Sequence, residues 1–453
     1  MRELVSKQRT FFDSQATKQL AFRIRQLKKL KQTIKANENL LFEAIYSDFK
    51  KSSFETYATE LALVYHELDV AIKKVRNWSR KKRVGTNLIN FPAKSYIIPE
   101  PLGVSLVIGA WNYPYLLSLA PLVGAMAAGC TVILKPSELP SGTSNVLSRI
   151  ISESFSEEYM AVVEGGVPET TALLQQCFDK IFFTGSTHVG KIIYKAAAEH
   201  LTPVTLELGG KSPAFVTADC NLKMTVKRLI WAKFLNSGQT CISPDFVMVD
   251  RSIEQQFLEQ CKKELEKERK SFENENYTQI IDDRNLNRLL RLIDKDKVYC
   301  GGTVTAEHRH IEPTILRDVT FQDAVMQEEI FGPILPVIAY DSLDEAIAKV
   351  RQMEKPLACY VFTTSQRNKK KVLEKISFGG GMVNDAVMHI SNSHLPYGGV
   401  GMSGMGAYHG EAGFKAFSHY KGVIEKSNLL EFPLKYFPHT QRKLWWIKQF
   451  FKF

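Results

Sequence analysis

The stretch from Ser105 to Leu134 contains no charged side chain. It is long enough to cross a bilayer as a single helix. Whether it forms one helix or several elements therefore distinguishes a membrane protein from a globular one. Residues that break helices interrupt it repeatedly: Gly109, Pro114, Pro121, Gly124 and Gly129. Such a run is typical of a buried strand, a loop, a helix and a second buried strand. The stretch therefore predicts the interior of a globular α/β domain.

The same alternation of strands and helices continues along the chain. We predict strands over 105–109, 131–135, 160–164, 181–184 and 204–208, and helices over 116–128, 143–155, 169–176 and 189–200. This rhythm is typical of a parallel, doubly wound sheet. Ligands of such sheets bind beyond the carboxyl ends of the strands. A second alternation from Ala214 to about Ser391 predicts another α/β domain.

Size and charge narrow the classes of protein that fit. A chain of 453 residues is long enough for more than one core, because single cores stop growing near ~250–300 residues. The net charge of +11 is scattered, and its densest cluster, Arg80–Arg83, is interpreted as a solvated segment. No zinc-finger or RNP-like signature accompanies the charge, so we expect no nucleic-acid partner.

Seven cysteines without a CxxC pair argue against a disulfide framework and a structural zinc site. The histidines at 389, 394, 409 and 419 also lack a ligand-carrying helix, so no metal is expected. The chain begins with a charged helical pattern and not a secretory signal. We therefore expect a cytoplasmic protein in a reducing compartment.

One cysteine stands in an unusual place. The segment Phe234–Cys241 ends a helix-like run, and Gly238, Gln239 and Thr240 then surround the thiol with backbone N–H groups instead of an apolar wall. A thiolate nucleophile needs such a site. The alternative is that Cys241 is one more buried core thiol.

A carboxylate precedes this cysteine by 34 residues. Glu207 lies in the apolar half of the segment Thr205–Lys211, which reads as a short strand broken by two glycines. Burial raises the pKa of a carboxyl group toward the range in which it acts as a base. Glu207 is therefore a candidate general base.

The segments Glu207–Lys211 and Gly238–Cys241 together resemble the aldehyde dehydrogenase superfamily. Further matches occur in the same order: Trp111–Pro114, Lys135–Glu138, Phe183–Ser186, Glu328–Pro333 and Pro396–Gly404. The resemblance covers nearly the whole chain up to His419. It is closest to the class 3 branch, which acts on medium- and long-chain aliphatic or aromatic aldehydes.

The resemblance implies a nicotinamide cofactor. The turn Gly185–Gly190 follows a strand and opens a helix, which suits a pyrophosphate, although it lacks the full G-x-G-x-x-G pattern and could be an ordinary turn. Glu138 would take the ribose hydroxyls, which favours NAD over NADP, although class 3 relatives often use both. The implied cofactor residues are Gly185, Ser186, Thr187, His188, Val189, Gly190, Lys135, Glu138, Trp111, Leu208, Glu329 and Phe331.

The resemblance also implies the reaction. Cys241 would attack the aldehyde to give a thiohemiacetal whose oxyanion is held by Asn112 and the Cys241 backbone N–H. After hydride transfer to the nicotinamide, Glu207 would activate the water that releases a carboxylic acid from the thioester. Two alternatives are transfer of the thioester to coenzyme A and a non-catalytic relative. A base for water argues against the first, and retention of all three residues argues against the second.

The expected domains are an NAD(P)-binding domain (1–83 and 101–208), a catalytic domain (209–410) and a small β oligomerisation arm (84–100 and 411–430). The arm prediction rests on an exposed hairpin over Thr86–Glu100, where Ile and Tyr alternate among polar residues. In the family such a strand pair joins a carboxy-terminal strand at the dimer contact. We therefore expect a homodimer.

The last segment, residues 431–453, is basic and aromatic. It has eight aromatic residues from Phe432 onward and no acidic residue after Glu431. Rings with interleaved cations suit the headgroup layer of an anionic bilayer, which would make this tail a peripheral membrane contact. The alternative is that it packs on its own dimer or across the substrate entrance, because its amphipathic pattern is imperfect.

Overall fold

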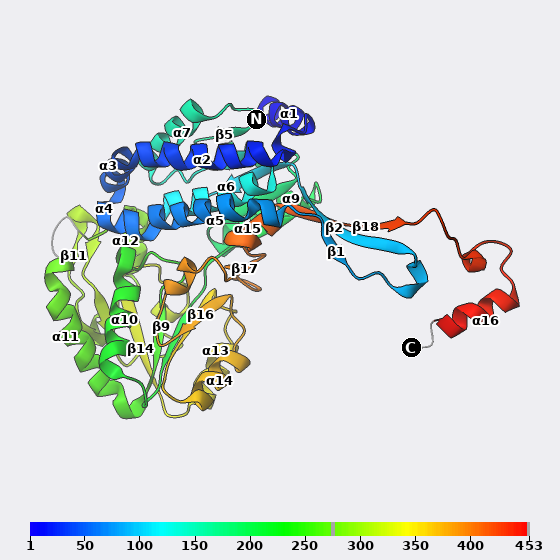
Figure 1. Cartoon of the computed structure of the whole chain (residues 1–453). Helices are drawn as coiled ribbons and strands as arrows, with labels where there is room; N and C mark the ends of the chain where they lie inside the picture. The colour runs from blue at the N-terminus through cyan, green and yellow to red at the C-terminus, as the bar shows by residue number, and fades with distance from the viewer. Residues whose placement is uncertain (273–276, 451–453) are drawn as a thin grey trace.

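The computed structural model describes residues 1–272 and 277–450 of the chain. Two α/β bodies lie against each other, and a narrow arm projects from one side of them (Figure 1). Each body is built around its own mostly parallel sheet. The predicted α/β class is confirmed.

The first sheet has the strand order β17-β7-β6-β3-β4-β5. Its five parallel strands match the predicted ones closely: β3 (Val104–Ile108), β4 (Thr131–Lys135), β5 (Met160–Val162), β6 (Lys180–Thr184) and β7 (Val204–Glu207). The chain winds outward from β3 in one direction through β4 and β5, then returns to β3's other side with β6 and β7. The order therefore reverses between β3 and β6, and ligands of doubly wound sheets bind at such a point.

The helices between these strands also lie where the sequence predicts them. They are α6 (Pro114–Ala128), α7 (Ser141–Ser154), α8 (Val167–Leu174) and α9 (Thr187–Ala198). Every residue of α6 is buried, because this helix lies between the sheet and the amino-terminal helices. The charge-free stretch is thus the predicted strand, loop, helix and strand. Among residues 1–272 and 277–450, no helix combines the length and apolar character that a membrane span requires.

The amino-terminal helices cover α6 and one edge of the first body (Figure 1). They are α1 (Arg2–Asp13), α2 (Leu20–Ala36), α3 (Glu38–Phe49), α4 (Ser53–Thr56), a π-helical turn at Tyr57–Leu61, and α5 (Ala62–Trp78). Leucine and isoleucine side chains at helical spacing point into the common core, as at Leu27, Leu30 and Ile34, which are fully buried.

The second body is built on a seven-stranded sheet of order β10-β13-β14-β9-β8-β15-β16. Its strands are β8 (Pro213–Val216), β9 (Phe246–Asp250), β10 (Val298–Cys300), β13 (Thr314–Leu316), β14 (Ile334–Tyr340), β15 (Ala358–Phe362) and β16 (Gly380–Val383). Only β10 runs antiparallel to its neighbour. The helices are α10 (Leu222–Phe234), α11 (Glu254–Phe272), α12 (Asp283–Leu290), α13 (Leu343–Arg351) and α14 (Gln366–Lys375), and a small hairpin joins β11 (Val304–Thr305) to β12 (His310–Ile311).

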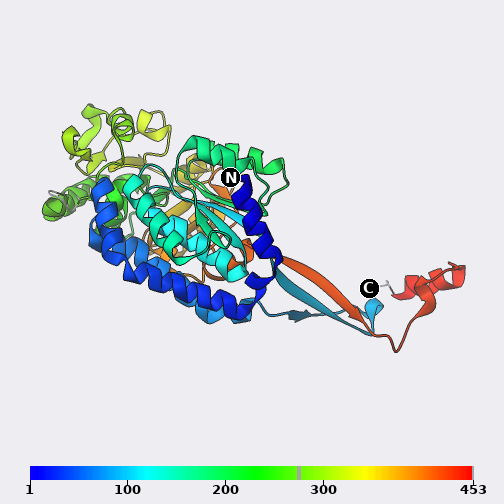
Figure 2. The same ribbon diagram turned by 90° about the horizontal axis from the view of Figure 1, so that it is seen from above.

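The projecting arm differs from the hairpin predicted over Thr86–Glu100. Its central strand is β2 (Ala93–Pro101), which pairs over its full length with the distant β18 (Ser418–Lys426) and only briefly with β1 (Lys82–Val84). The Ile and Tyr alternation therefore marks one strand, and its main partner comes from the end of the chain. Figure 2 shows β2 and β18 leaving the body together.

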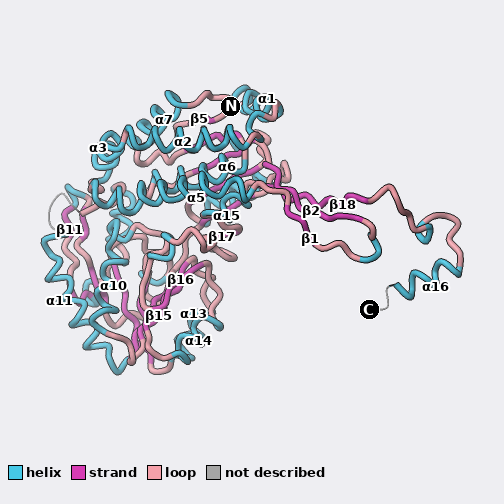
Figure 3. The backbone as a smooth tube through the Cα atoms, viewed as in Figure 1, coloured by secondary structure: helices cyan, strands magenta, loops and turns pink. Residues whose placement is uncertain are grey.

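The segment beyond β18 lies apart from both α/β bodies (Figure 3). It carries the short helix α16 (Gln441–Phe450), and its side chains at Leu444, Trp445 and Trp446 are exposed. Returning from the second body to the first, the chain forms β17 (Gly404–Met405) and α15 (Gly410–Ala416) before it reaches β18.

Candidate functional site

Four parallel strands of the first sheet deliver predicted site residues to the same edge. Asn112 follows β3, Lys135 ends β4, the turn Gly185–Gly190 follows β6, and Glu207 ends β7. Because the carboxyl ends of parallel strands share one edge of a sheet, these residues gather there. Cys241 reaches the same edge from the second body.

The loop that carries Cys241 has an unusual backbone. After α10 ends at Phe234, Asn236, Ser237 and Gly238 take φ values of 54°, 52° and 70°. A Cβ on Gly238 would also lie 2.2 Å from the carbonyl oxygen of Gly332, so only glycine fits there. The loop therefore bends sharply and packs directly on the segment that carries Glu329 and Phe331.

The buried Gln239 fixes this loop from within. Its side-chain amide donates to the carbonyl oxygens of Asn236 at 3.1 Å and Gln279 at 3.0 Å, and its Oε1 accepts the N–H of Ile281 at 3.0 Å. All of these partners belong to the second body. The Gln239 side chain thus ties the backbone before Cys241 to the second body.

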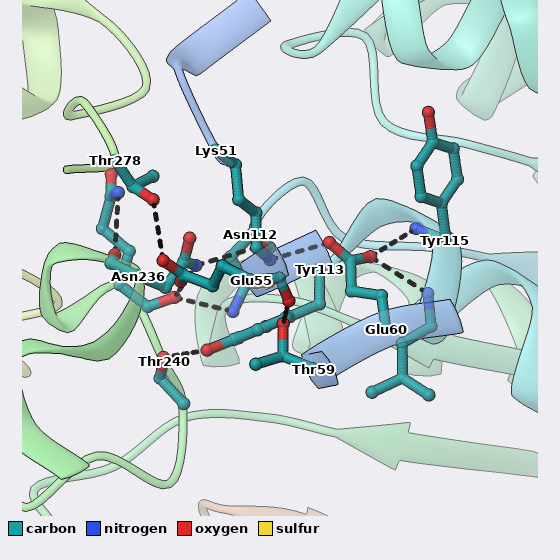
Figure 4. A network of polar contacts seen from close by, with 12 residues as sticks. Lys51, Glu55, Thr59, Glu60, Asn112, Tyr113, Tyr115, Asn236, Thr240 and Thr278 are labelled. Carbon is teal, nitrogen blue, oxygen red and sulfur yellow. Dashed lines mark hydrogen bonds and ion pairs between the residues drawn. The ribbon is translucent and has the colours of Figure 1, made fainter. Parts of the chain in front are cut away.

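Asn112 connects the first body to this loop. Its Nδ2 donates to the carbonyl oxygen of Gln239 at 3.0 Å, and its own carbonyl oxygen accepts from Asn236 Nδ2 at 2.9 Å (Figure 4). The structure therefore brings Asn112 beside the loop that carries Cys241, as the sequence predicts. An amide nitrogen has two N–H donors, so one remains for an oxyanion.

A buried ion pair supports the same region, and the sequence did not reveal it. Lys51 Nζ lies 2.7 Å from Glu60 Oε1, and both side chains are fully buried. The other oxygen of Glu60 accepts the backbone N–H groups of Tyr115 at 2.8 Å and Leu116 at 3.2 Å, at the start of α6 (Figure 4). The amino terminus of a helix favours negative charge. Glu60 therefore anchors α6 while it pairs with Lys51.

The ion pair reaches the nucleophile loop through Tyr113. Lys51 Nζ lies 3.9 Å from the centroid of the Tyr113 ring, and the hydroxyl of that tyrosine is 2.6 Å from Thr240 Oγ1. Thr240 immediately precedes Cys241. Lys51 and Glu60 thus hold the ring whose hydroxyl contacts the loop. Lys51 lies in the loop between α3 and α4 and Glu60 in the π-helical turn, so no regular pattern in the sequence marks the pair as buried.

Cys241 is half-buried, and its Sγ lies 3.4 Å from the hydroxyl oxygen of Tyr397. Burial raises the pKa of the thiol to about 12, the Tyr397 hydroxyl opposes this shift, and the charges of Glu329 and Glu207 add to it. The site is thus less favourable to a thiolate than its glycine and polar neighbours predict. The reason is that two carboxyl groups and aromatic rings surround the sulfur.

Glu207 is 2% exposed at the end of β7. Neither of its carboxyl oxygens has a hydrogen-bond partner within the described part of the chain. Burial without a partner raises the pKa of this carboxyl group well above its ordinary value. Glu207 thus lies close enough to Cys241 to affect the pKa of its thiol, and its own pKa is raised, as the sequence predicts for a buried carboxyl group.

Glu329 and Phe331 lie on the same side of the nucleophile loop. Burial, with the charge of Asp245, raises the pKa of Glu329 to about 8, and the backbone N–H of Gly210 bonds its carboxylate and opposes this. The Phe331 ring stands edge-on to Trp111, with centroids 5.4 Å apart. Trp111 of the first body therefore contacts Phe331 of the second, two residues along the chain from Glu329.

The turn after β6 has the features of a nucleotide-binding turn. Ser186 caps α9, since its Oγ accepts the Val189 N–H at 3.4 Å. A Cβ on Gly190 would lie 2.7 Å from Leu208 Cδ2, so glycine lets the helix pack closely on the end of β7. His188 and Val189 are exposed beside it. An open, capped helix amino terminus of this kind fits a pyrophosphate.

Lys135 and Glu138 flank the end of β4. Lys135 is 1% exposed, and its Nζ donates to the Pro136 carbonyl oxygen at 2.7 Å and lies 3.6 Å from Glu138 Oε2. Burial lowers the pKa of the lysine. The Glu138 side chain is half-exposed, so it is accessible to ribose hydroxyls. The two residues contact each other and not Cys241.

Comparison with known proteins agrees with this geometry. Residues 1–423 match the model of the aldehyde dehydrogenase family. The chain is 44% identical to 4,4'-diaponeurosporen-aldehyde dehydrogenase of Staphylococcus aureus, over 98% of this chain and 97% of that one. It is 47% identical to the dimeric NADP-preferring aldehyde dehydrogenase of Rattus norvegicus, over 95% of each.

A solved structure supports the same relationship. The substrate-bound state of Staphylococcus aureus AldH superposes with a TM-score of 0.96 at 44% identity, over 99% of each chain. Other relatives are named as members of aldehyde dehydrogenase family 3, which confirms the class 3 prediction. The chain therefore belongs to the aldehyde dehydrogenase family and is an oxidoreductase that converts aldehydes to carboxylic acids with NAD(P).

Proposed function

We propose that Cys241 is the nucleophile of this reaction, Asn112 its oxyanion donor and Glu207 its general base. The observation that carries the proposal is the buried carboxyl group of Glu207, which has no partner among the described residues and lies close enough to Cys241 to affect the pKa of its thiol. A structural carboxylate at this depth would be paired.

Each residue has one task. Cys241 Sγ bonds to the aldehyde carbon, and the free N–H of the Asn112 amide and the Cys241 backbone N–H hold the resulting oxyanion. An oxyanion donor of this kind is worth about 3–4 kcal/mol. Glu207 then takes a proton from the water that attacks the thioester, and the acid leaves. Because water needs a base and a thiol acceptor does not, Glu207 favours hydrolysis over transfer to coenzyme A.

We propose that residues at the carboxyl edge of the first sheet, together with Glu329 and Phe331 of the second body, bind the cofactor. The turn Gly185–Gly190 would hold the pyrophosphate, Lys135 and Glu138 the adenosine ribose, and Glu329 the nicotinamide ribose, with Trp111, Leu208 and Phe331 around the ring. When bound, NAD(P)+ supplies the hydride acceptor. Glu138 favours NAD, because its charge repels a 2′-phosphate.

Two variants test these roles. Cys241→Ala should abolish NADH formation and leave NAD binding unchanged; normal turnover in this variant would overturn the nucleophile assignment. Glu207→Gln should give a burst of NADH near one equivalent followed by slow turnover, because the base acts after hydride transfer. Full steady turnover at neutral pH would place the base elsewhere.

We also propose that the chain forms a homodimer through the arm. In the single chain, β18 is exposed along most of its length, as at Tyr420, Val423 and Ile424. An exposed strand edge readily pairs with a second chain. A relative is named as dimeric. A monomeric mass at micromolar concentration would contradict the dimer, and Ile424→Lys should weaken it where Lys421→Gln does not.

The proposed domain limits are 1–83 with 101–208 for the cofactor, 209–410 for catalysis, and 84–100 with 411–430 for the arm.

Seven unpaired cysteines support a reducing, cytoplasmic setting.

The tail beyond Glu431 is proposed to contact membranes from their surface. Exposed apolar side chains, such as Phe437, Trp445 and Trp446, accompany Lys443 and Lys448 on a segment that lies apart from the bodies. Each basic residue adds about 1 kcal/mol at an anionic surface. Such a site would suit a medium- or long-chain aldehyde that partitions into lipid; one relative is named for diaponeurosporen-aldehyde.

Vesicle co-sedimentation tests this tail. The full chain should bind phosphatidylserine vesicles at low salt and lose binding at high salt, whereas a chain ending at Glu431 should not bind. A matched variant with Lys435, Arg442, Lys443 and Lys448 changed to Gln should bind weakly while it keeps its rings. Equal absence of binding by all three proteins would leave only a packing role.

A further inference from the structure

Tyr397 is the side chain that hydrogen-bonds the proposed nucleophile. Its hydroxyl oxygen lies 3.4 Å from Cys241 Sγ, and within residues 1–272 and 277–450 it is the one side-chain partner of that sulfur. Tyr397 is 6% exposed. It comes from the segment between β16 and β17, which is far from Cys241 in the sequence and carries none of the roles proposed above.

The position of this hydroxyl is fixed by the surrounding structure. The backbones of Tyr397 and Tyr408 exchange two hydrogen bonds, of 3.0 and 2.8 Å. The Tyr397 ring stacks on His409 at 5.2 Å and 14°, and it meets Tyr408 edge-on at 5.6 Å. A ring held by its backbone and by stacking keeps its hydroxyl oxygen beside the sulfur. Either atom can donate while the thiol keeps its proton, but only the hydroxyl can donate to a thiolate.

The other ionisable groups near the sulfur do not help a thiolate. When ionised, Glu207 and Glu329 act against it, and burial lowers the pKa of His409 and of His389 to about 4, so both rings are neutral at neutral pH. Three more tyrosines face the sulfur closely enough to be influenced by its charge: Tyr113, Tyr360 and Tyr408.

These tyrosines direct their hydroxyl groups differently. Tyr113 bonds Thr240 and Tyr360 donates to the Ile242 carbonyl oxygen at 2.5 Å, whereas the Tyr408 hydroxyl has no partner among the described residues. Among the described residues, Tyr397 is thus the one tyrosine whose hydroxyl lies within hydrogen-bond distance of the sulfur.

We propose that Tyr397 is a further catalytic residue, whose hydroxyl donates a hydrogen bond that stabilises the Cys241 thiolate before it attacks the aldehyde. The thiol proton leaves to solvent, and Tyr397 keeps its own proton because burial raises the pKa of its phenol well above the ordinary value. When Sγ bonds to carbon, the sulfur loses its charge and the hydrogen bond weakens. The proposal rests on the nucleophile role of Cys241 proposed above.

Tyr397→Phe tests the proposal, because it removes the hydroxyl and keeps the stacked ring. The readout is the rate of Cys241 alkylation by iodoacetamide at fixed pH between about 7 and 9, followed by mass spectrometry of the peptide that contains Cys241. Below the thiol pKa this rate reports the thiolate fraction. We expect a fall of about tenfold to a hundredfold, typical of a lost hydrogen bond to a charged group, and a similar fall in the single-turnover rate of NADH formation.

Tyr360→Phe is the matched control, since it removes an equally buried hydroxyl that bonds a backbone oxygen and not the sulfur. It should leave the alkylation rate within about twofold. Site-specific 3-fluorotyrosine at position 397 keeps the shape and makes the donor more acidic, so it should raise the rate. Unchanged alkylation in both Tyr397 variants would overturn the inference and leave the nucleophile assignment intact. Full activity in Cys241→Ala would instead overturn the proposed function.

Discussion

Two buried glutamates at the site show opposite ways of placing a carboxyl group inside a protein. Glu60 is bonded at both oxygens, one by Lys51 and the other by two backbone N–H groups. Glu207 is bonded at neither oxygen by any residue that the structure describes. The first carboxyl group holds Lys51 and the start of α6 in place, whereas the second has no such structural task, as its proposed role as a base requires. Burial alone therefore does not identify a functional carboxylate; the bonding of its oxygens does.

The largest expected effect follows from removing the bonded carboxylate. Glu60→Ala should lower the free energy of unfolding by about 3–5 kcal/mol, because it leaves the Lys51 charge buried without its partner. Chemical denaturation followed by circular dichroism measures the loss.

The matched change Glu207→Ala removes an equally buried carboxyl group. No described residue hydrogen-bonds this group, so its removal leaves no buried partner unpaired. It should cost much less stability than Glu60→Ala while it impairs turnover. If the two variants lost equal stability, the contrast between the carboxyl groups would be wrong.

An intermediate effect concerns pH. Below the ordinary carboxyl pKa, Glu207 is protonated in both the folded and unfolded chain. As pH rises above that value, the unfolded chain releases the proton while the folded chain retains it, since the pKa is raised by burial. Folding stability is thereby lost with rising pH, by about 1.4 kcal/mol per pH unit until the folded pKa is reached.

Glu207→Gln removes this dependence, so the variant should match the wild type near pH 4 and exceed it in stability at pH 7. Denaturation of both proteins across this pH range measures the difference between their free energies of unfolding. The contributions of all other titrating groups are the same in both proteins and cancel in this difference. A constant difference would mean that the folded carboxyl group ionises normally.

The smallest expected effect lies in the link from the ion pair to the loop. Tyr113→Phe removes the hydrogen bond to Thr240 and leaves that buried hydroxyl without its tyrosine partner, so the loss of stability should be about 1 kcal/mol. The ring and its contact with Lys51 remain. Lys51→Met should cost several times more, and an equal cost for both would show that the hydroxyl, not the cation, carries the connection.

Much of this arrangement could be predicted from the sequence. The strands β3 to β7 and their helices lie within a few residues of their expected limits, because each combines an apolar run with glycine or proline at its ends. Asn112, Glu207 and the turn after β6 follow from that, since each lies at a strand end. The proposed roles of these residues stay predictions that the variants above test.

Other features depend on contacts between distant segments. The pairing of β2 with β18 joins residues more than 300 positions apart, so the local alternation of Ile and Tyr gives no sign of the partner; only the family resemblance predicted a carboxy-terminal strand there. Lys51 and Glu60 look like ordinary charges of solvated helices until α6 packs over them. Tyr397 stands in a glycine-rich motif whose sequence gives no sign that its hydroxyl reaches the sulfur.

The ladder between β6 and β7 has a consequence for redesign of the enzyme. The backbone carbonyl of Glu207 accepts the N–H of Gly185, the first residue of the nucleotide-binding turn, at 3.0 Å. Thr184, the residue before that glycine, is the register partner of Glu207. The proposed base and the turn are thus adjacent in one ladder with no flexible segment between them. Engineers who reshape the turn to exchange NAD for NADP would move the base as well, so coenzyme preference and thioester hydrolysis should change together and need to be selected together.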